Sequence, residues 1–169
     1  MKKDHAAISV MPGIMACNHI QQLYMCLPKR ARIKKIAHPH ITLLFGVTTD
    51  DESTIKSWLG DFGPFMIKVK NPAVVSPDGK DYDVVILDVE VGMGLAVRKG
   101  LVEHALASNM LDPIYDYYPF RPHISIGRIT RDHKVDLASE ELNSFNGREL
   151  QIRDLIIHTM DRKIIEIEL

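Results

Sequence analysis

The chain has 169 residues, of which 46% are hydrophobic and 25% charged, as expected of one globular domain with its own core. Lys and Arg together number 21 and Asp and Glu number 22, so the formal net charge is -1. Proteins that track long nucleic acids normally carry a strong basic excess, because binding depends on neutralising many phosphates. The charge balance therefore argues against a long duplex partner, whereas a small anionic ligand in a locally basic pocket is compatible with it.

The chain contains two cysteines, Cys17 and Cys26. Two cysteines in a chain of this length are too few for a disulfide framework, and their spacing does not match a zinc-binding pattern. We interpret them as reduced thiols, which is typical of a cytoplasmic protein.

The N-terminal segment superficially resembles an export signal, because two lysines precede an apolar run. However, Asp4 and His5 interrupt the change from charged to apolar residues, and Pro12-Gly13 divide the apolar run. No run in the sequence approaches the roughly 20 apolar residues that a membrane-spanning helix needs. The sequence therefore predicts a cytoplasmic protein without a membrane partner.

Hydrophobic periodicity predicts strands and helices that alternate along the chain. In chain order the predicted elements are a strand at 5–11, a helix at 18–27, a strand at 40–47, a helix at 49–62, strands at 65–75 and 81–91, a helix at 92–109, a strand at 123–129, a short helix at 136–145, and strands at 149–160 and 163–169. Asn18 is expected to cap the first helix and Gly60 to end the second. The basic segment 28–35 is expected to be a connector.

The order of these elements is similar in the two halves of the chain, and no linker or low-complexity segment divides the halves. We therefore predict a single α+β domain, 1–169, made of two related lobes. Trp58 lies at helical spacing with other apolar residues and is expected in the core.

Two of the predicted strands open with nearly the same letters, PHITL and PHISI. Successive strand residues point to opposite faces, so His40 and Thr42 share one face, as do His123 and Ser125. Either copy alone would be better explained as a strand-edge histidine held by local hydrogen bonds. The shared proline, isoleucine and strand context favour a functional pair. The opposite face of each strand is expected to pack into the core and carries Ile41, Leu43, Phe45, Ile124 and Ile126.

Two histidines that converge on one phosphodiester can act as an acid–base pair near neutral pH. Hydroxyls placed two residues further on can donate hydrogen bonds to the non-bridging oxygens, where negative charge accumulates. This chemistry requires no metal ion, and no carboxylate cluster suited to Mg²⁺ stands out in the sequence. The expected reaction is an in-line displacement at phosphorus.

The segments PHITLLFG and RPHISIGR closely resemble the paired His-x-[Ser/Thr]-x signatures of the 2H phosphoesterase superfamily. That superfamily includes LigT-like (2'-5' RNA ligase-like) enzymes and cyclic phosphodiesterases. Its compact phage members include enzymes that destroy the cyclic oligonucleotide messengers of bacterial CBASS immunity. The resemblance spans nearly the whole chain. It implies a bilobal fold of antiparallel sheet with outer helices, in which the motif strands face each other across a central cleft.

The resemblance implies that His40 and His123 are the catalytic histidines and that the hydroxyls of Thr42 and Ser125 hold the phosphate. The second motif departs slightly from the pattern, because Gly-Arg stands where many members continue an apolar strand. We interpret this departure as a bulge or an open cleft rim. In a regular strand Arg128 would lie on the apolar face, so it is not expected to contact the substrate.

An aromatic cluster and a cation precede the second motif, namely Tyr115, Tyr117, Tyr118, Phe120 and Arg121. Aromatic rings beside a phosphate site favour base stacking, although packing between the lobes is the preferred explanation for Tyr118 and Phe120. Tyr117 and Arg121 share the strand parity of His123. We therefore expect Tyr117 and Arg121 to contact the substrate.

Several other residues near the motifs allow two interpretations. The basic segment 28–35 is either a funnel for phosphates or a solvated helix end and loop. His38 lies at the cleft mouth or at a solvated strand start. His158 could approach the cleft, but a histidine with satisfied hydrogen bonds at the surface or in the core is the preferred interpretation.

The sequence thus predicts a metal-independent phosphodiesterase without a cofactor that acts on a small ribonucleotide. A cyclic oligonucleotide, a 2'-5' linkage or a 2',3'-cyclic phosphate would suit this chemistry. The short, nearly neutral chain favours a cyclic or short oligonucleotide, including cyclic nucleotide immune messengers. Two alternatives stay open: a module that sequesters nucleotides without turnover, and an RNA ligase that forms 2'-5' bonds.

Overall fold

The computed structural model describes residues 5–60, 62–112 and 120–169. Its strands are β1 (Ala6–Pro12), β2 (Arg32–Lys35), β3 (Ile41–Val47), β4 (Phe65–Val75), β5 (Tyr82–Glu90), β6 (His123–Thr130), β7 (Glu149–His158) and β8 (Ile164–Glu168). Its helices are α1 (Ile14–Leu23), α2 (Glu52–Leu59), α3 (Gly92–Ala107) and α4 (Glu140–Asn143), with a 3₁₀ turn, η1 (Tyr24–Cys26).

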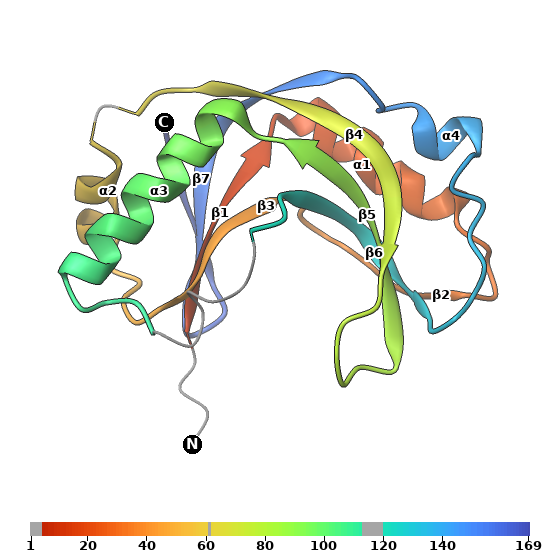
Figure 1. Cartoon of the computed structure of the whole chain (residues 1–169), viewed down its shortest axis with the longest axis horizontal. Coiled ribbons are helices and arrows are strands. Elements are labelled where there is room, and N and C mark those ends of the chain that lie inside the picture. The colour runs from red at the N-terminus through yellow and green to blue at the C-terminus, as the bar shows by residue number, and fades with distance from the viewer. Residues whose placement is uncertain (1–4, 61, 113–119) are drawn as a thin grey trace.

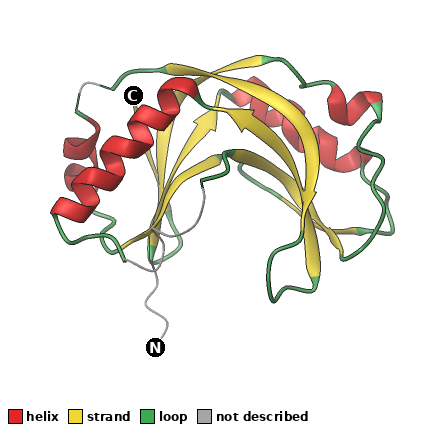
Figure 2. Ribbon diagram, viewed as in Figure 1, coloured by secondary structure: helices red, strands yellow, loops and turns green. Residues whose placement is uncertain are grey.

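The strands form one antiparallel sheet in the order β2-β6-β5-β4-β7-β1-β3, with β8 paired to β7 off this path. The sheet bends into an arch, as Figure 1 shows, and the helices cover its outer face. Helices α2 and α3 lie over one half of the arch and α1 and α4 over the other (Figure 2). The predicted α+β class with two lobes and outer helices is therefore confirmed, and the lobes are the two halves of one continuous sheet.

The core lies between the sheet and the helices. Helix α3 contacts β3 and β4, while α1 contacts β1 and β6. Ile8, Ile41 and Ile124 are fully buried in this layer, and Trp58 belongs to it as predicted. We call the opposite, uncovered side of the sheet the concave face. Because the sheet bends, β3 and β6 come into contact although they lie near opposite ends of the strand order.

Most of the predicted elements are confirmed, including the end of α2 at Gly60, which has a φ of +57°. Helix α1 differs, because it begins directly after Gly13 and places Asn18 in its interior. The prediction that Asn18 is the N-cap was therefore wrong: buried Cys17 already belongs to the apolar stripe of the helix. Cys17 and Cys26 are both free thiols.

The basic segment 28–35 is not a connector throughout, because its second half forms β2. Among the described strands β2 lies at the edge of the sheet, where β6 is its one partner. Its residues are mostly exposed, so it lacks the alternation of apolar and polar residues by which strands are recognised in a sequence. None of the helices among the described residues combines the length and apolar character needed to cross a membrane.

Both motif strands contain a β-bulge directly after the motif hydroxyl. In β3 the extra residue is Leu43, which has no partner in β1, and in β6 it is Ile126, which has no partner in β5. An inserted residue shifts the alternation, so residues after it lie on the face opposite to that expected for a regular strand. Phe45 and Arg128 consequently lie on the concave face with the motif histidines.

Two predictions about these residues were therefore wrong. Phe45 does not face the core, since 46% of its surface is exposed. Arg128 does not share the apolar face of β6. It pairs with Val84 of β5, and Ser125 pairs with Ile86. Val84 and Ile86 lie on the same side of β5, so Arg128 lies on the same face of β6 as Ser125. The interpretation of Gly127-Arg128 as a bulge is confirmed.

Glycine at 127 is required by the close approach of η1 to the bulge. A Cβ atom at this position would lie 2.3 Å from Cδ2 of Tyr24 and 3.1 Å from the carbonyl oxygen of Lys34. The Tyr24 ring is buried, and the Lys34 carbonyl belongs to the backbone of β2, so neither can move away freely. Gly127 thus lets the bulge form against the helical layer.

We predict that Gly127→Ala lowers the free energy of unfolding by about 1–3 kcal/mol, because the added methyl group overpacks this contact. Urea denaturation of the purified protein would measure the change. Gly92→Ala is the matched control, since a Cβ atom there meets nothing within 4 Å. An unfolding free energy equal to that of the control would contradict this account of the bulge.

Candidate active site

The two motif histidines are held by equivalent hydrogen bonds at the starts of their strands. Nδ1 of His40 lies 2.7 Å from the carbonyl oxygen of His38, and Nδ1 of His123 lies 2.8 Å from the carbonyl oxygen of Arg121. A carbonyl oxygen only accepts hydrogen bonds, so Nδ1 carries the proton and donates it. In the neutral ring Nε2 is then unprotonated. Both rings therefore keep Nε2 as the atom available for proton transfer.

The motif hydroxyls lie on the concave face beside these rings. Ser9 of β1 is fully buried, and its Oγ donates a hydrogen bond to Thr42 Oγ1 over 3.5 Å. Because Thr42 accepts this bond, its own hydroxyl proton is available for an acceptor on the concave side. Ser125 is half-buried and lies opposite Ile86 of β5. The sequence prediction that each histidine shares a face with its hydroxyl agrees with this arrangement.

Electrostatics connect the two motifs. Burial lowers the pKa of His40, and the charges that His123 and His38 can carry lower it further, against the opposing hydrogen bond to the His38 carbonyl. A charge effect of this kind acts over a short range in a partly buried site. Together with the contact between β3 and β6, it indicates that the two histidines share one site.

Arg121 lies beside His123, as its parity predicted, but its guanidinium is engaged by Asp88. Nε and Nη2 of Arg121 each donate to one Asp88 oxygen over 2.9 Å. Asp88 itself lies opposite His123 in the register of β5 and β6. Phe120 packs against the core with the Arg98 guanidinium 4.5 Å from its ring centroid, in keeping with the expected lobe packing. Tyr117, the other expected substrate contact, lies outside the described residues.

The structure adds a third histidine, His158, for which the sequence allowed an approach to the cleft but favoured another interpretation. His158 ends β7, and its ring centroid lies 4.7 Å from that of His40, with an angle of 49° between the rings. Its Nε2 is buried and has no hydrogen-bond partner among the described residues. The prediction of a satisfied surface or core histidine was therefore wrong. No local pattern revealed this contact, because it joins strands from opposite ends of the chain.

Arg128 is a further residue that sequence reasoning left out of the site. Its guanidinium carbon lies 4.6 Å from the centroid of the Tyr82 ring, a cation–π contact. Lys34 of β2 is its partner in the register and belongs to the basic segment 28–35. The signal that could have located Arg128 is Gly127, which is typical of a bulge inside a strand.

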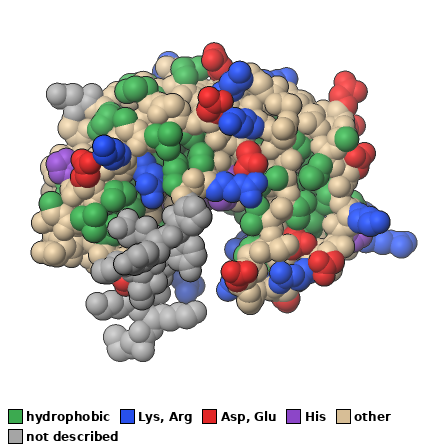
Figure 3. All heavy atoms as spheres, in the orientation of Figure 1, with side chains coloured by type: hydrophobic (Ala, Val, Ile, Leu, Met, Phe, Trp, Pro, Cys, Tyr) green, Lys and Arg blue, Asp and Glu red, His purple; other side chains and the backbone are tan. Residues whose placement is uncertain are grey.

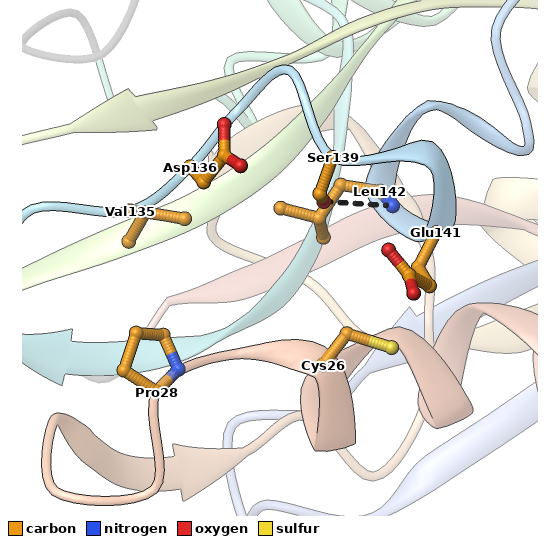
Figure 4. Close-up of a pocket in the computed structure, with 7 residues that line it drawn as sticks. All are labelled: Cys26, Pro28, Val135, Asp136, Ser139, Glu141 and Leu142. Atoms are coloured by element: carbon orange, nitrogen blue, oxygen red, sulfur yellow. Dashed lines mark hydrogen bonds between the residues drawn. The ribbon is translucent and has the colours of Figure 1, made fainter.

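A cavity elsewhere in the molecule does not belong to this site. It has a volume of about 310 Å³ and is lined by Cys26, Pro28, Val135, Asp136, Ser139, Glu141 and Leu142. Figure 4 shows it between η1 and the segment that leads into α4, with two carboxylates on its wall. These carboxylates would repel a phosphate, and no motif residue lines the cavity.

The described part of the chain contains no group of three or more His, Cys, Asp and Glu side chains placed to hold a metal ion. Figure 3 shows the molecule hollowed between the two halves of the arch. Basic, acidic and apolar side chains are interspersed on the face in view (Figure 3), in keeping with the net charge of -1. The surface in view is therefore not that of a protein with one extended basic track.

Comparison with known proteins agrees with this geometry. The model of the family described as the 2'-5' RNA ligase superfamily matches residues 12–163, most of the chain. No curated protein gives a significant match.

Solved structures share the fold at low sequence identity. The Thermus thermophilus protein TT0787 has a TM-score of 0.66 at 16% identity, over 98% of this chain and 94% of its own. Escherichia coli LigT complexed with 3'-AMP has a TM-score of 0.65 at 14% identity, over 98% and 95% of the two chains. Kluyveromyces marxianus Usb1 with uridine monophosphate has a TM-score of 0.62 at 11% identity, over 100% of both chains. The paired motifs, the arched sheet and the family match together identify the chain as a member of the 2'-5' RNA ligase superfamily of 2H phosphoesterases.

Proposed function

We propose that the protein is a metal-independent phosphodiesterase that cleaves a small ribonucleotide phosphodiester by acid–base catalysis between His40 and His123. The observation that carries this proposal is the matched pair of imidazoles on one concave face. Each ring is fixed through Nδ1 and keeps Nε2 for proton transfer. Each is also accompanied by a hydroxyl on the same strand.

The proposed step is an in-line displacement in which two protons move. Nε2 of one neutral histidine takes the proton of the attacking 2'-hydroxyl or water as its oxygen bonds to phosphorus. The bond from phosphorus to the leaving oxygen breaks on the opposite side, and Nε2–H of the other, protonated histidine gives its proton to that oxygen. The two histidines thus supply both proton transfers, and no metal ion is needed for either.

The hydroxyls of Thr42 and Ser125 are proposed to hold the non-bridging oxygens. Negative charge increases on these oxygens as the new bond forms, so donors fixed in advance stabilise the transition state. The bond from buried Ser9 leaves the Thr42 hydroxyl a proton to donate outward.

The substrate we propose is a short or cyclic oligonucleotide, including cyclic nucleotide messengers. The structures of E. coli LigT with 3'-AMP and of K. marxianus Usb1 with uridine monophosphate support a nucleotide as ligand. On the concave face, the Phe45 ring and the Arg128 guanidinium on Tyr82 offer planar groups on which bases can stack. The nearly neutral charge favours a substrate with few phosphates.

The first test is an incubation with EDTA of the wild-type protein, His40→Ala and His123→Ala. The panel contains cyclic di- and trinucleotides, 2'-5'-linked oligoadenylates and nucleoside 2',3'-cyclic phosphates, with products identified by mass. We expect wild-type protein to cleave one class and each variant to be slower by about 10²–10⁴, with unchanged unfolding curves, because each lacks one proton-transfer group. A variant with unimpaired turnover would exclude this role for its histidine.

The same panel separates the alternatives. A nucleotide retained by the wild-type protein and recovered intact would favour sequestration without turnover. Joined RNA ends, in a parallel incubation with RNA fragments, would favour ligation. Cleavage that requires added metal would contradict two-histidine catalysis.

The hydrogen-bond geometry also predicts the tautomers of both neutral histidines. We expect ¹⁵N NMR of the imidazoles to show the proton on Nδ1 of His40 and His123, because each Nδ1 faces a carbonyl oxygen. The exposed His133 serves as the control in the same spectrum. A proton on Nε2 in the neutral form of either motif histidine would contradict the proposed site.

Removal of the motif hydroxyls is expected to affect the chemical step more than the fold. Thr42→Val and Ser125→Ala should each lower kcat by about 10²–10³, since each removes one donor to the developing charge. Thr42→Ser keeps the hydroxyl and is the matched control, expected to remain close to the wild type. Equal kcat values for Thr42→Val and Thr42→Ser would show that this hydroxyl does not hold the phosphate.

A further inference from the structure

We propose that His158 is a positioning residue that keeps His40 neutral, so that His40 serves as the general base and His123 as the general acid during cleavage. The inference rests on the proposed two-histidine phosphodiesterase function and divides its two proton transfers between the histidines. It derives from the contact of His158 with His40, which the second motif lacks among the described residues.

The contact between the two rings excludes water from one side of His40. The centroids lie 4.7 Å apart, and β1 separates the strands that carry the two residues. His158 lies opposite Ala7 of β1, whose small side chain leaves room for the ring. Nε2 of His158 is buried and has no hydrogen-bond partner among the described residues, so no carboxylate there stabilises a proton on this atom.

The groups around His40 favour its neutral form. The charges that lower the pKa of His40 come from two other histidines, His38 in the preceding loop and His123 of β6. His158 of β7 acts differently, by covering one side of the His40 ring. Other polar or charged groups lie on this face of β1, β7 and β8, or just before β1. They are Ser9, Glu149, Gln151, Asp154, Glu166, Glu168 and His5, the last bonded to Asp112. In the described part of the chain, no carboxylate forms a hydrogen bond or ion pair with His40 or His158.

The environment of His158 reinforces this effect. Burial lowers its pKa to about 4, with smaller contributions from the charges that His40 and His38 can carry. His158 is therefore neutral near pH 7. It offers the adjacent His40 ring no negative charge that would stabilise a proton there. A protonated His40 ring would lie against a neutral, desolvated ring, which disfavours the charged form.

The second motif has a different set of neighbours. Next to His123 lie Asp88 and Arg121, which neutralise each other through two hydrogen bonds. The carboxylate of Asp88 lies opposite His123 in the register and is only partly exposed. The role of general acid falls to His123 because His40 takes the role of base, and the reaction needs one histidine in each role. The two motifs, nearly identical in sequence, thus provide different environments for a proton.

A substrate whose leaving group needs no proton distinguishes the two roles. In uridine 3'-(4-nitrophenyl phosphate) the 2'-hydroxyl still requires a base, whereas 4-nitrophenolate leaves without an acid. We expect His123→Ala to cleave this ester within about tenfold of the wild type, while His40→Ala remains at least about 100-fold slower. The reverse pattern would overturn the assignment. Failure of the wild type on this ester and on every nucleotide of the panel would instead overturn the proposed function.

The role of His158 is tested by pH profiles of kcat/KM. The free enzyme is active when its base is neutral, so activity falls on the acid side as the base becomes protonated. His158→Ala admits water to His40, raises its pKa, and should move the acid limb to higher pH. His158→Phe retains an aromatic ring that cannot be protonated and should keep the limb near its wild-type position. Either variant should lose less than about tenfold on the plateau, where loss of a catalytic group costs about 10²–10⁴.

A purely structural role would produce a different result. It would lower activity by the same factor at every pH and leave the acid limb in place, which would overturn the proposal. ¹³C NMR titration of the His40 ring in the wild type and both variants gives the same comparison without substrate. An unchanged His40 titration in His158→Ala, with an intact unfolding curve, would contradict the inference whatever the enzyme's activity.

Discussion

The hydrogen bond from each motif imidazole to the carbonyl two residues before it is the contact on which the site depends. It fixes the ring and the tautomer, and it leaves Nε2 as the reactive atom. The intervening Pro39 and Pro122 explain why each strand opens in this way. Proline restricts the residue before it to extended backbone and fixes its own φ at about -65°. The proline in each motif is thus part of how the histidine is oriented.

The bend of the sheet brings the two motif strands, β3 and β6, together on one concave face (Figure 1). Helices on the outer face bury one side of β3 and β6, which leaves the concave side for polar residues. The bulges after Thr42 and Ser125 then bring Phe45 and Arg128 to that side. The relatives with solved structures are only 11–16% identical to this chain, yet they share its fold over nearly their whole length. Such a fold therefore tolerates wide variation in sequence.

The parts of this structure that depend on the order of neighbouring residues could be predicted from the sequence. Periodicity located the long elements, and the repeated motif identified which residues share a face. Prediction from the sequence failed where pairing with a distant segment determines the local structure. An example is β2, which is a strand because β6 offers it an edge. The prediction failed at Phe45 and Arg128 because one inserted residue reverses the alternation. The preferred interpretation of His158 failed for a third reason, since the order of β7, β1 and β3 is what brings it to His40.

The two motifs are nearly equal in sequence, but among the described residues His158 lies against the histidine of the first motif. In the proposed reaction this difference assigns the two proton transfers. The central claim is that both motifs act on one phosphorus. A crystal structure with uridine and orthovanadate tests this claim most directly. The vanadate ester imitates the five-coordinate transition state at the 2' and 3' oxygens. We predict vanadium bound on the concave face, with Nε2 of His40 and Nε2 of His123 on opposite sides and the hydroxyls of Thr42 and Ser125 on its remaining oxygens. Vanadate that contacts only one motif, or that occupies the cavity beside Cys26, would contradict it.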